Sequence, residues 1–176
     1  MAWIHAEPDA DVEAVAVVPA RCEDVFAFLA DLENHWRLTG RFVEVIDLSG
    51  APGRPADGGR VRIRGPLGLR RTAATRVAAV RAPRLIIGTA ELPSGTRARV
   101  SWSLAGHLDS TRVRLAAGLE RAGVLDRALL ALGGRWWLRR QFASTLERLA
   151  AAMAASGGGA EGGAQQAALT EAFTDL

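Results

Sequence analysis

Apolar and polar residues alternate along much of the chain up to residue 120, and this alternation predicts β-strands. It is strict at 60–64, where arginine alternates with β-branched residues, and it continues from Ala98 to Leu104, where every second residue is apolar. Short segments rich in glycine and proline separate the runs and predict tight turns. The predicted strands cover residues 12–18, 42–48, 60–64, 70–81, 84–92, 97–105 and 111–120.

Helical spacing of apolar residues occurs at both ends of this series. A short helix is predicted over 22–30, which has acidic residues in its first turn, and a second short helix or turn follows to Trp36. Residues 124–154 predict a long C-terminal helix with two apolar stripes. The stripes are rotated by roughly a quarter turn relative to each other. Because Gly133 and Gly134 lie where the phase changes, we expect a kink or break there.

Length and composition predict a single globular domain. The chain has 176 residues, of which 49% are hydrophobic and 23% charged. Residues 156–166 have the glycine-rich composition of a flexible linker, so we assign 1–155 to the folded domain and 156–176 to a flexible tail. A single cysteine, Cys22, excludes an internal disulfide and is expected to be structural. Neither a long apolar run nor a secretory leader is visible, which favours a cytoplasmic location.

The basic residues are all arginine, and they alternate with apolar residues in the predicted strands. Ten arginines and one acidic residue lie between positions 60 and 99, so this sheet face should point to solvent. A docking surface for acidic partners, including Arg62, Arg97 and Arg112, is the alternative. We expect no nucleic-acid binding, because no stacking aromatic residues alternate on that face and arginine alone inflates the pI of 10.7.

The order of predicted elements is a strand, two short helices, about six antiparallel strands and a long helix. The segment from Val17 to Asp31 combines a strand, a Pro19–Ala20 turn and a helix that ends in a Leu-x-Asp step, and Trp36 follows shortly after. This segment resembles the opening of the START-like, or Bet v 1-like, SRPBCC superfamily, and within it the polyketide cyclase/dehydrase and lipid-transport proteins. The resemblance extends over about residues 10–154.

The resemblance implies an α+β helix-grip fold, in which a curved antiparallel sheet wraps around a long C-terminal helix. It also implies an internal hydrophobic cavity that binds an apolar small molecule, such as a polyketide, lipid or isoprenoid, without a cofactor. The alternating strands and the amphipathic helix independently provide two apolar faces that could enclose such a cavity. If the protein is an enzyme, cyclisation or dehydration is the implied reaction.

Large, rigid side chains on the inner faces are the candidates for the cavity wall, although each could equally belong to an ordinary core. They lie on the predicted strands, on the long helix and just after the first short helix. The predicted ligand-binding residues are Trp36, Phe42, Ile63, Val100, Trp102, Leu104, Trp136 and Phe142.

His35 is the candidate for proton transfer, because an unperturbed imidazole titrates near neutral pH and His35 adjoins the predicted cavity. An exposed loop histidine without a role is the alternative. The chain has no tyrosine, which excludes the tyrosine-dependent mechanism that the resemblance implies for aromatic-clasp enzymes. No metal-binding or nucleotide-binding motif is present, and we expect neither a metal nor a cofactor.

The segment from Arg135 to Arg140 places Trp136 and Trp137 between arginines, a composition suited to a membrane interface. Packing of both tryptophans over the sheet edge or into the cavity is the alternative. The sequence thus leaves three functions open. These are a ligand-binding protein that catalyses cyclisation or dehydration, a non-catalytic lipid carrier that docks on membranes, and a protein-binding module with a basic sheet face.

Overall fold

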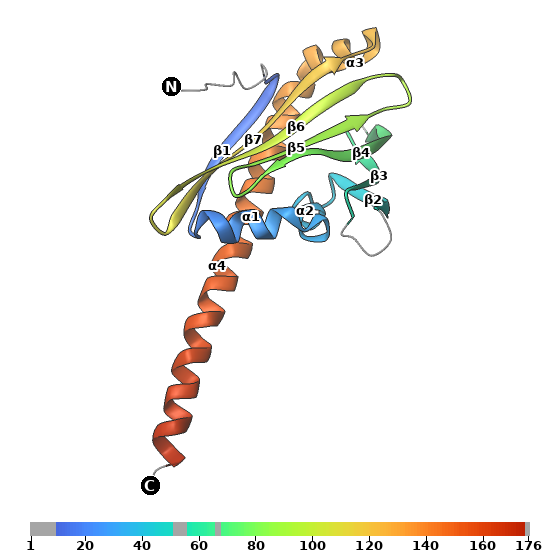
Figure 1. Cartoon of the computed structure of the whole chain (residues 1–176). Helices are drawn as coiled ribbons and strands as arrows, with labels where there is room; N and C mark the ends of the chain where they lie inside the picture. The colour runs from blue at the N-terminus through green and yellow to red at the C-terminus, as the bar shows by residue number, and fades with distance from the viewer. Residues whose placement is uncertain (1–9, 51–55, 66–67, 175–176) are drawn as a thin grey trace.

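The computed structural model describes residues 10–50, 56–65 and 68–174, with side chains up to residue 156 (Figure 1). Its elements follow the order expected from the hydrophobic pattern, and their boundaries shift by at most a few residues except at the end of the last helix, which extends to Thr174 instead of residue 154. They are β1 (Val12–Val18), α1 (Cys22–Ala30), α2 (Leu32–Leu38), β2 (Val43–Ser49), β3 (Gly58–Arg64), β4 (Arg70–Arg81), β5 (Leu85–Glu91), β6 (Arg97–His107), β7 (Ser110–Arg121), α3 (Val124–Leu129), the π-helical turn η2 (Leu130–Gly134) and α4 (Arg135–Thr174).

The seven strands form one antiparallel sheet in the order β1-β7-β6-β5-β4-β3-β2. Strands β2 to β7 form a meander, and the two short helices carry the chain from β1 at one edge to β2 at the other. Register shifts in β2 and β4 increase the local bend and twist of the sheet. Figure 1 shows the first part of α4 lying across one face of the sheet, while α1 and α2 cross at its end. The α+β helix-grip fold is therefore confirmed.

The core lies between the sheet and the apolar stripe of α4. Phe142, Leu146, Leu149 and Met153 recur every three or four residues along this helix, and all four are buried. They pack in one cluster with residues of β1, α1, β6 and β7. Helix α4 continues to Thr174, past the core and through the segment for which the sequence predicts a flexible tail. The division of the chain at residue 155 stays a prediction.

The predicted break in the C-terminal helix is confirmed at the glycine pair. Leu132 and Gly133 leave helical geometry, and Gly133 has a φ of +111°, which a residue with a Cβ adopts only with strain. The kink separates α3 from α4, and the two helices therefore present their apolar residues in different directions.

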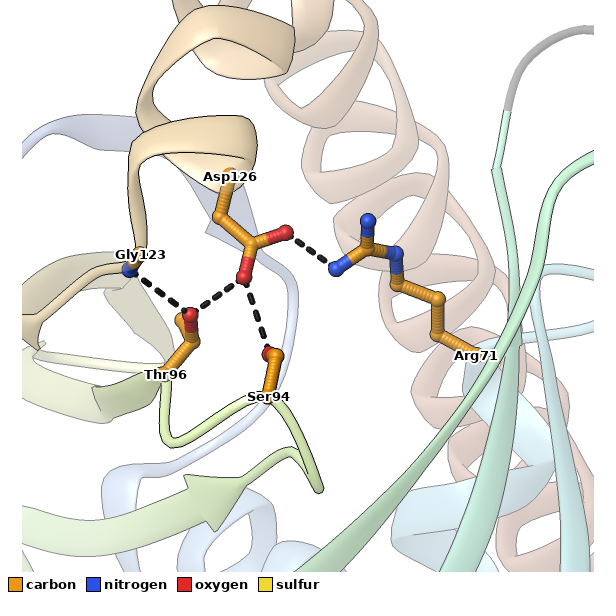
Figure 2. Close-up of polar contacts among 5 residues, drawn as sticks. All are labelled: Arg71, Ser94, Thr96, Gly123 and Asp126. Atoms are coloured by element: carbon orange, nitrogen blue, oxygen red, sulfur yellow. Dashed lines mark hydrogen bonds and ion pairs between the residues drawn. The ribbon is translucent and has the colours of Figure 1, made fainter.

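A polar cluster anchors α3 to the sheet (Figure 2). The carboxylate of Asp126 accepts hydrogen bonds from the hydroxyl groups of Thr96 and Ser94, the latter at 3.0 Å, and it forms an ion pair with Arg71. The Thr96 hydroxyl also accepts a hydrogen bond of 3.2 Å from the N–H of Gly123. Since these residues come from β4, the β5–β6 turn and the start of α3, the Asp126 cluster joins three segments that are distant in sequence.

Candidate ligand-binding cavity

A cavity of about 260 Å³ lies between the concave face of the sheet and helices α2 and α4. The alternation in β6 turns Ala98, Val100 and Trp102 toward it, and the pairing of Val100 with Ala117 continues the same surface onto β7. The wall is apolar over nearly all of its surface. Its larger apolar residues include Trp36, Phe42, Val61, Ile63, Val77, Ile86, Val100, Trp102, Leu115, Leu138 and Phe142.

The structure brings most of the predicted site residues to this one cavity. They come from α2, from the segment before β2, from strands β3 and β6 and from α4, which meet only in the folded chain. The predicted residues in the wall are His35, Trp36, Phe42, Ile63, Val100, Trp102 and Phe142.

Two other predicted ligand-binding residues, Leu104 and Trp136, lie outside the cavity wall. Leu104 sits farther along β6 and is buried in the core between sheet and helices. Trp136 is 67% exposed, and the Arg140 guanidinium lies 6.0 Å from the centre of its ring. Because residues two apart on a helix point in nearly opposite directions, Trp136 faces away when Leu138 faces inward.

His35 lies on helix α2 and is neither in a loop nor exposed, which corrects the alternative interpretation of this residue. Its ring meets those of Trp36 and Trp102 edge-on, with centroid distances of 5.0 and 5.3 Å. Burial lowers the pKa of His35 to about 4, and a backbone hydrogen bond involving Leu29 opposes this shift only in part. At neutral pH the imidazole is therefore uncharged, so it has no proton to give as an imidazolium acid.

Two charged side chains, Asp57 and Arg76, also line the cavity, and both are exposed. Their strands are neighbours, since Gly58 pairs with Arg76 and the Val77 N–H donates to the Asp57 carbonyl at 2.6 Å. The cavity thus reaches solvent beside the start of β3. Its charged groups lie at this opening, while most of the deeper wall is apolar.

The described residues give little support to a reactive cysteine nucleophile or to a metal-binding group of side chains. The Cys22 thiol is buried and donates to the Pro83 carbonyl at 3.3 Å. Burial raises the pKa of this thiol, which disfavours the nucleophilic thiolate. Within residues 10–50, 56–65 and 68–174, no three His, Cys, Asp or Glu side chains are grouped closely enough to hold a metal ion.

The arginines of the outer sheet face are paired more extensively than their spacing in the sequence indicates. Glu44 lies opposite Arg62 on the neighbouring strand and contacts both Arg62 and Arg64. Glu91 contacts Arg97 at 2.6 Å across the β5–β6 pair. These cross-strand pairs neutralise part of the positive charge expected from residues 60–99, which weakens the case for a docking surface for acidic partners.

Apolar residues are exposed along α3, η2 and the first turn of α4, at the opposite end of the domain core from Met153. The exposed fractions reach 87% for Val124 and 84% for Leu132. We call the following residues the α3–α4 patch: Val124, Leu125, Leu129, Leu132 and Trp136. The sequence already indicates the α3–α4 patch, because the apolar stripe before the glycine pair is rotated away from the apolar stripe that faces the core.

Trp137, the second tryptophan of the proposed membrane segment, is half-buried, and its ring packs edge-on against Phe42 with centroids 5.0 Å apart. Only Trp136 of the pair is exposed. No helix in the described part of the chain combines the length and apolarity needed to cross a membrane.

The similarity of this protein to a known family covers most of the chain. A family model described as polyketide cyclase/dehydrase and lipid transport matches residues 9–154. No curated protein matches the sequence.

Several solved structures share the fold at low sequence identity. A protein from Thermus thermophilus is 21% identical with a TM-score of 0.57, and the match covers 82% of this chain and 97% of that one. A protein from Mycobacterium smegmatis is 15% identical with a TM-score of 0.58, covering 82% and 90% of the two chains. A protein from Arthrobacter aurescens is 12% identical with a TM-score of 0.59, covering 81% and 84%. These similarities concern the fold alone.

Proposed function

Because the chain belongs to the polyketide cyclase/dehydrase and lipid transport family, we propose that its cavity binds a compact apolar small molecule, such as a polyketide, lipid or isoprenoid. The observation that carries this proposal is the apolar cavity of about 260 Å³ between sheet and helix. Its volume lies just below the usual range of about 300–1,000 Å³ for ligand pockets, which favours a compact ligand. Transfer of apolar ligand surface from water to this wall supplies about 25 cal/mol per Å².

If the ligand is reactive, the cavity wall can promote its reaction by confining it. A flexible chain held in a folded shape has its reacting atoms close together, which favours cofactor-free cyclisation or dehydration. His35 is the histidine in the cavity wall, and as an uncharged imidazole it acts through hydrogen bonds. Acid–base catalysis by His35 receives less support than binding does.

The proposal predicts that filling the cavity prevents ligand binding. Val100→Trp places a large ring inside the cavity, whereas Val80→Trp places the same ring on β4 at a position that is 53% exposed. N-phenyl-1-naphthylamine, a neutral dye that fluoresces in apolar surroundings, is the probe. We expect the wild type and Val80→Trp to bind it with similar affinity, and Val100→Trp to bind at least about tenfold more weakly.

Equal dye binding by Val100→Trp and Val80→Trp would contradict the proposal, provided that circular dichroism shows both variants folded. A smaller replacement, Val100→Phe, keeps the test available if the tryptophan variant does not fold. Native mass spectrometry of the purified protein, followed by organic extraction, then identifies any molecule that the cavity retains.

We further propose, as a second function, that the α3–α4 patch contacts membranes during ligand transfer. Its apolar residues are exposed, and Arg127, Arg139 and Arg140 lie exposed in the same segment. Arginine beside exposed leucine and tryptophan suits the boundary between anionic headgroups and acyl chains. The partner to which the proposal commits is therefore an anionic lipid surface.

Leu132→Asn is expected to weaken binding to phosphatidylglycerol-containing vesicles by about tenfold, because burial of one leucine contributes about 1.5–3 kcal/mol. Leu108→Asn is the matched control, since Leu108 is 86% exposed at the β6–β7 turn. Co-sedimentation with the vesicles measures the effect. If both variants bind as the wild type does, the α3–α4 patch is not the contact surface.

A further inference from the structure

We propose that the indole N–H groups of Trp36 and Trp102, which flank the His35 ring, form a donor corner that recognises a neutral oxygen acceptor on an otherwise apolar ligand. This inference rests on the proposed ligand-binding function and deepens it, because it states which polar group the ligand carries and which wall of the cavity receives it.

The first observation is a concentration of unpaired polar atoms. Nδ1 of His35, Nε1 of Trp36 and Nε1 of Trp102 are buried and have no hydrogen-bond partner. They are the only buried side-chain nitrogen or oxygen atoms in this condition among the residues that the structure describes. Buried polar groups in folded proteins are nearly always paired, so three exceptions at one place require an explanation.

The second observation is their common location. All three residues line the cavity, and they come from two elements, α2 and β6. The His35 ring contacts both tryptophan rings edge-on. The three residues therefore meet at one corner of the cavity, where a single ligand oxygen could accept hydrogen bonds from both indole N–H groups.

The chemistry of these groups selects the ligand. An indole N–H is only a donor, so Trp36 and Trp102 both require an acceptor atom. Because burial keeps the His35 imidazole uncharged, the donor corner carries no full positive charge that would balance a buried carboxylate. A carbonyl, ester or phenolic oxygen satisfies the donors without introducing an unpaired charge.

Binding requires a small rearrangement of the rings. Water does not reach the two indole N–H groups, so the ligand oxygen meets them only when the rings turn toward the cavity. Trp36 is only partly buried, whereas Trp102 is 2% exposed. We therefore expect Trp36 to move more than Trp102 when an oxygen-bearing ligand enters.

The test uses two probes of similar shape, 2-acetylnaphthalene and 2-ethylnaphthalene, of which only the first carries an acceptor oxygen. Each displaces N-phenyl-1-naphthylamine from the wild type and from Trp36→Phe and Trp102→Phe, which keep an aromatic ring but lose the N–H. We expect each replacement to weaken binding of the ketone by about fivefold to tenfold and to change binding of the hydrocarbon less than twofold. Trp136→Phe is the matched control, because Trp136 lies outside the cavity wall and is exposed.

Nuclear magnetic resonance provides a direct readout of the same contacts. The indole N–H signals of Trp36 and Trp102, assigned from the two variants, should move downfield when the ketone binds and not when the hydrocarbon binds. If both probes bind but the replacements affect them equally, the donor corner is overturned while the binding cavity stands. If neither probe binds and the dye does not bind either, the proposed function and this inference both fail.

Discussion

Replacement of Asp126 with asparagine is expected to lower the free energy of unfolding by about 3 kcal/mol. The carboxylate is buried, accepts hydrogen bonds from Thr96 and Ser94 and pairs with Arg71, as Figure 2 shows. An asparagine of the same size would leave the largely buried Arg71 guanidinium without its counter-charge. Removal of one partner from such a pair costs more than loss of a surface ion pair, because the remaining charge stays desolvated.

Glu91→Gln is the matched control for Asp126→Asn, since it makes the same chemical change in the exposed ion pair with Arg97. Pairs of that kind contribute about 0–1 kcal/mol. Urea denaturation of the three proteins measures the difference. Equal stability of the two variants would show that the Asp126 cluster contributes no more than a surface contact does.

Hydrogen bonding and charge also determine the pH below which the Asp126 cluster no longer stabilises the fold. Burial alone would raise the pKa of Asp126, but the hydroxyl donors Thr96 and Ser94 and the charge of Arg71 outweigh it, and the pKa lies below its ordinary value. The stabilisation is therefore present above about pH 4 and is lost as the pH falls further. Membrane contact by the α3–α4 patch would depend on this anchor, because the cluster positions α3.

Most of the fold could be predicted because each strand and helix carries its own periodicity. The alternation in β6 places Val100 and Trp102 on one face whatever partner the strand has, so their inward orientation follows from the sequence. The glycine pair at 133–134 likewise marks the kink locally. What periodicity does not determine is how far along each strand the cavity extends, which is why Leu104, on the same face as Trp102, lies in the core instead.

Contacts between distant segments are the part that the sequence could not supply. A count of charges within residues 60–99 finds one acidic residue, yet Glu44 pairs with two arginines there from outside that window. No sequence pattern singles out Asp126 either, because its partners lie 30 and 55 residues away. The sequence predicts an ordinary pKa for His35, because Trp102 covers its ring only after β6 and α2 come together.

A second large effect is expected in mild acid, where His35 alone should reduce the free energy of unfolding by about 2 kcal/mol between pH 7 and pH 5. In the folded protein, burial holds the pKa of His35 at about 4. In the unfolded chain it returns to about 6.5. Between these values the unfolded chain binds a proton that the folded protein does not, so this stabilisation is complete above about pH 6.5 and is lost as the pH falls toward 4.

His35→Gln removes this titration while retaining a polar side chain, and the exposed His107 at the β6–β7 turn supplies the matched control His107→Gln. Urea denaturation at pH 7 and pH 5 measures both variants beside the wild type. We expect His35→Gln to lose about 2 kcal/mol less than the wild type does on acidification, and His107→Gln to follow the wild type. An unchanged pH dependence in His35→Gln would mean that the imidazole is already protonated or solvated in the folded protein. Because the donor corner requires an uncharged imidazole beside the two indoles, that result would also remove the reason for preferring a neutral oxygen over a carboxylate as its ligand.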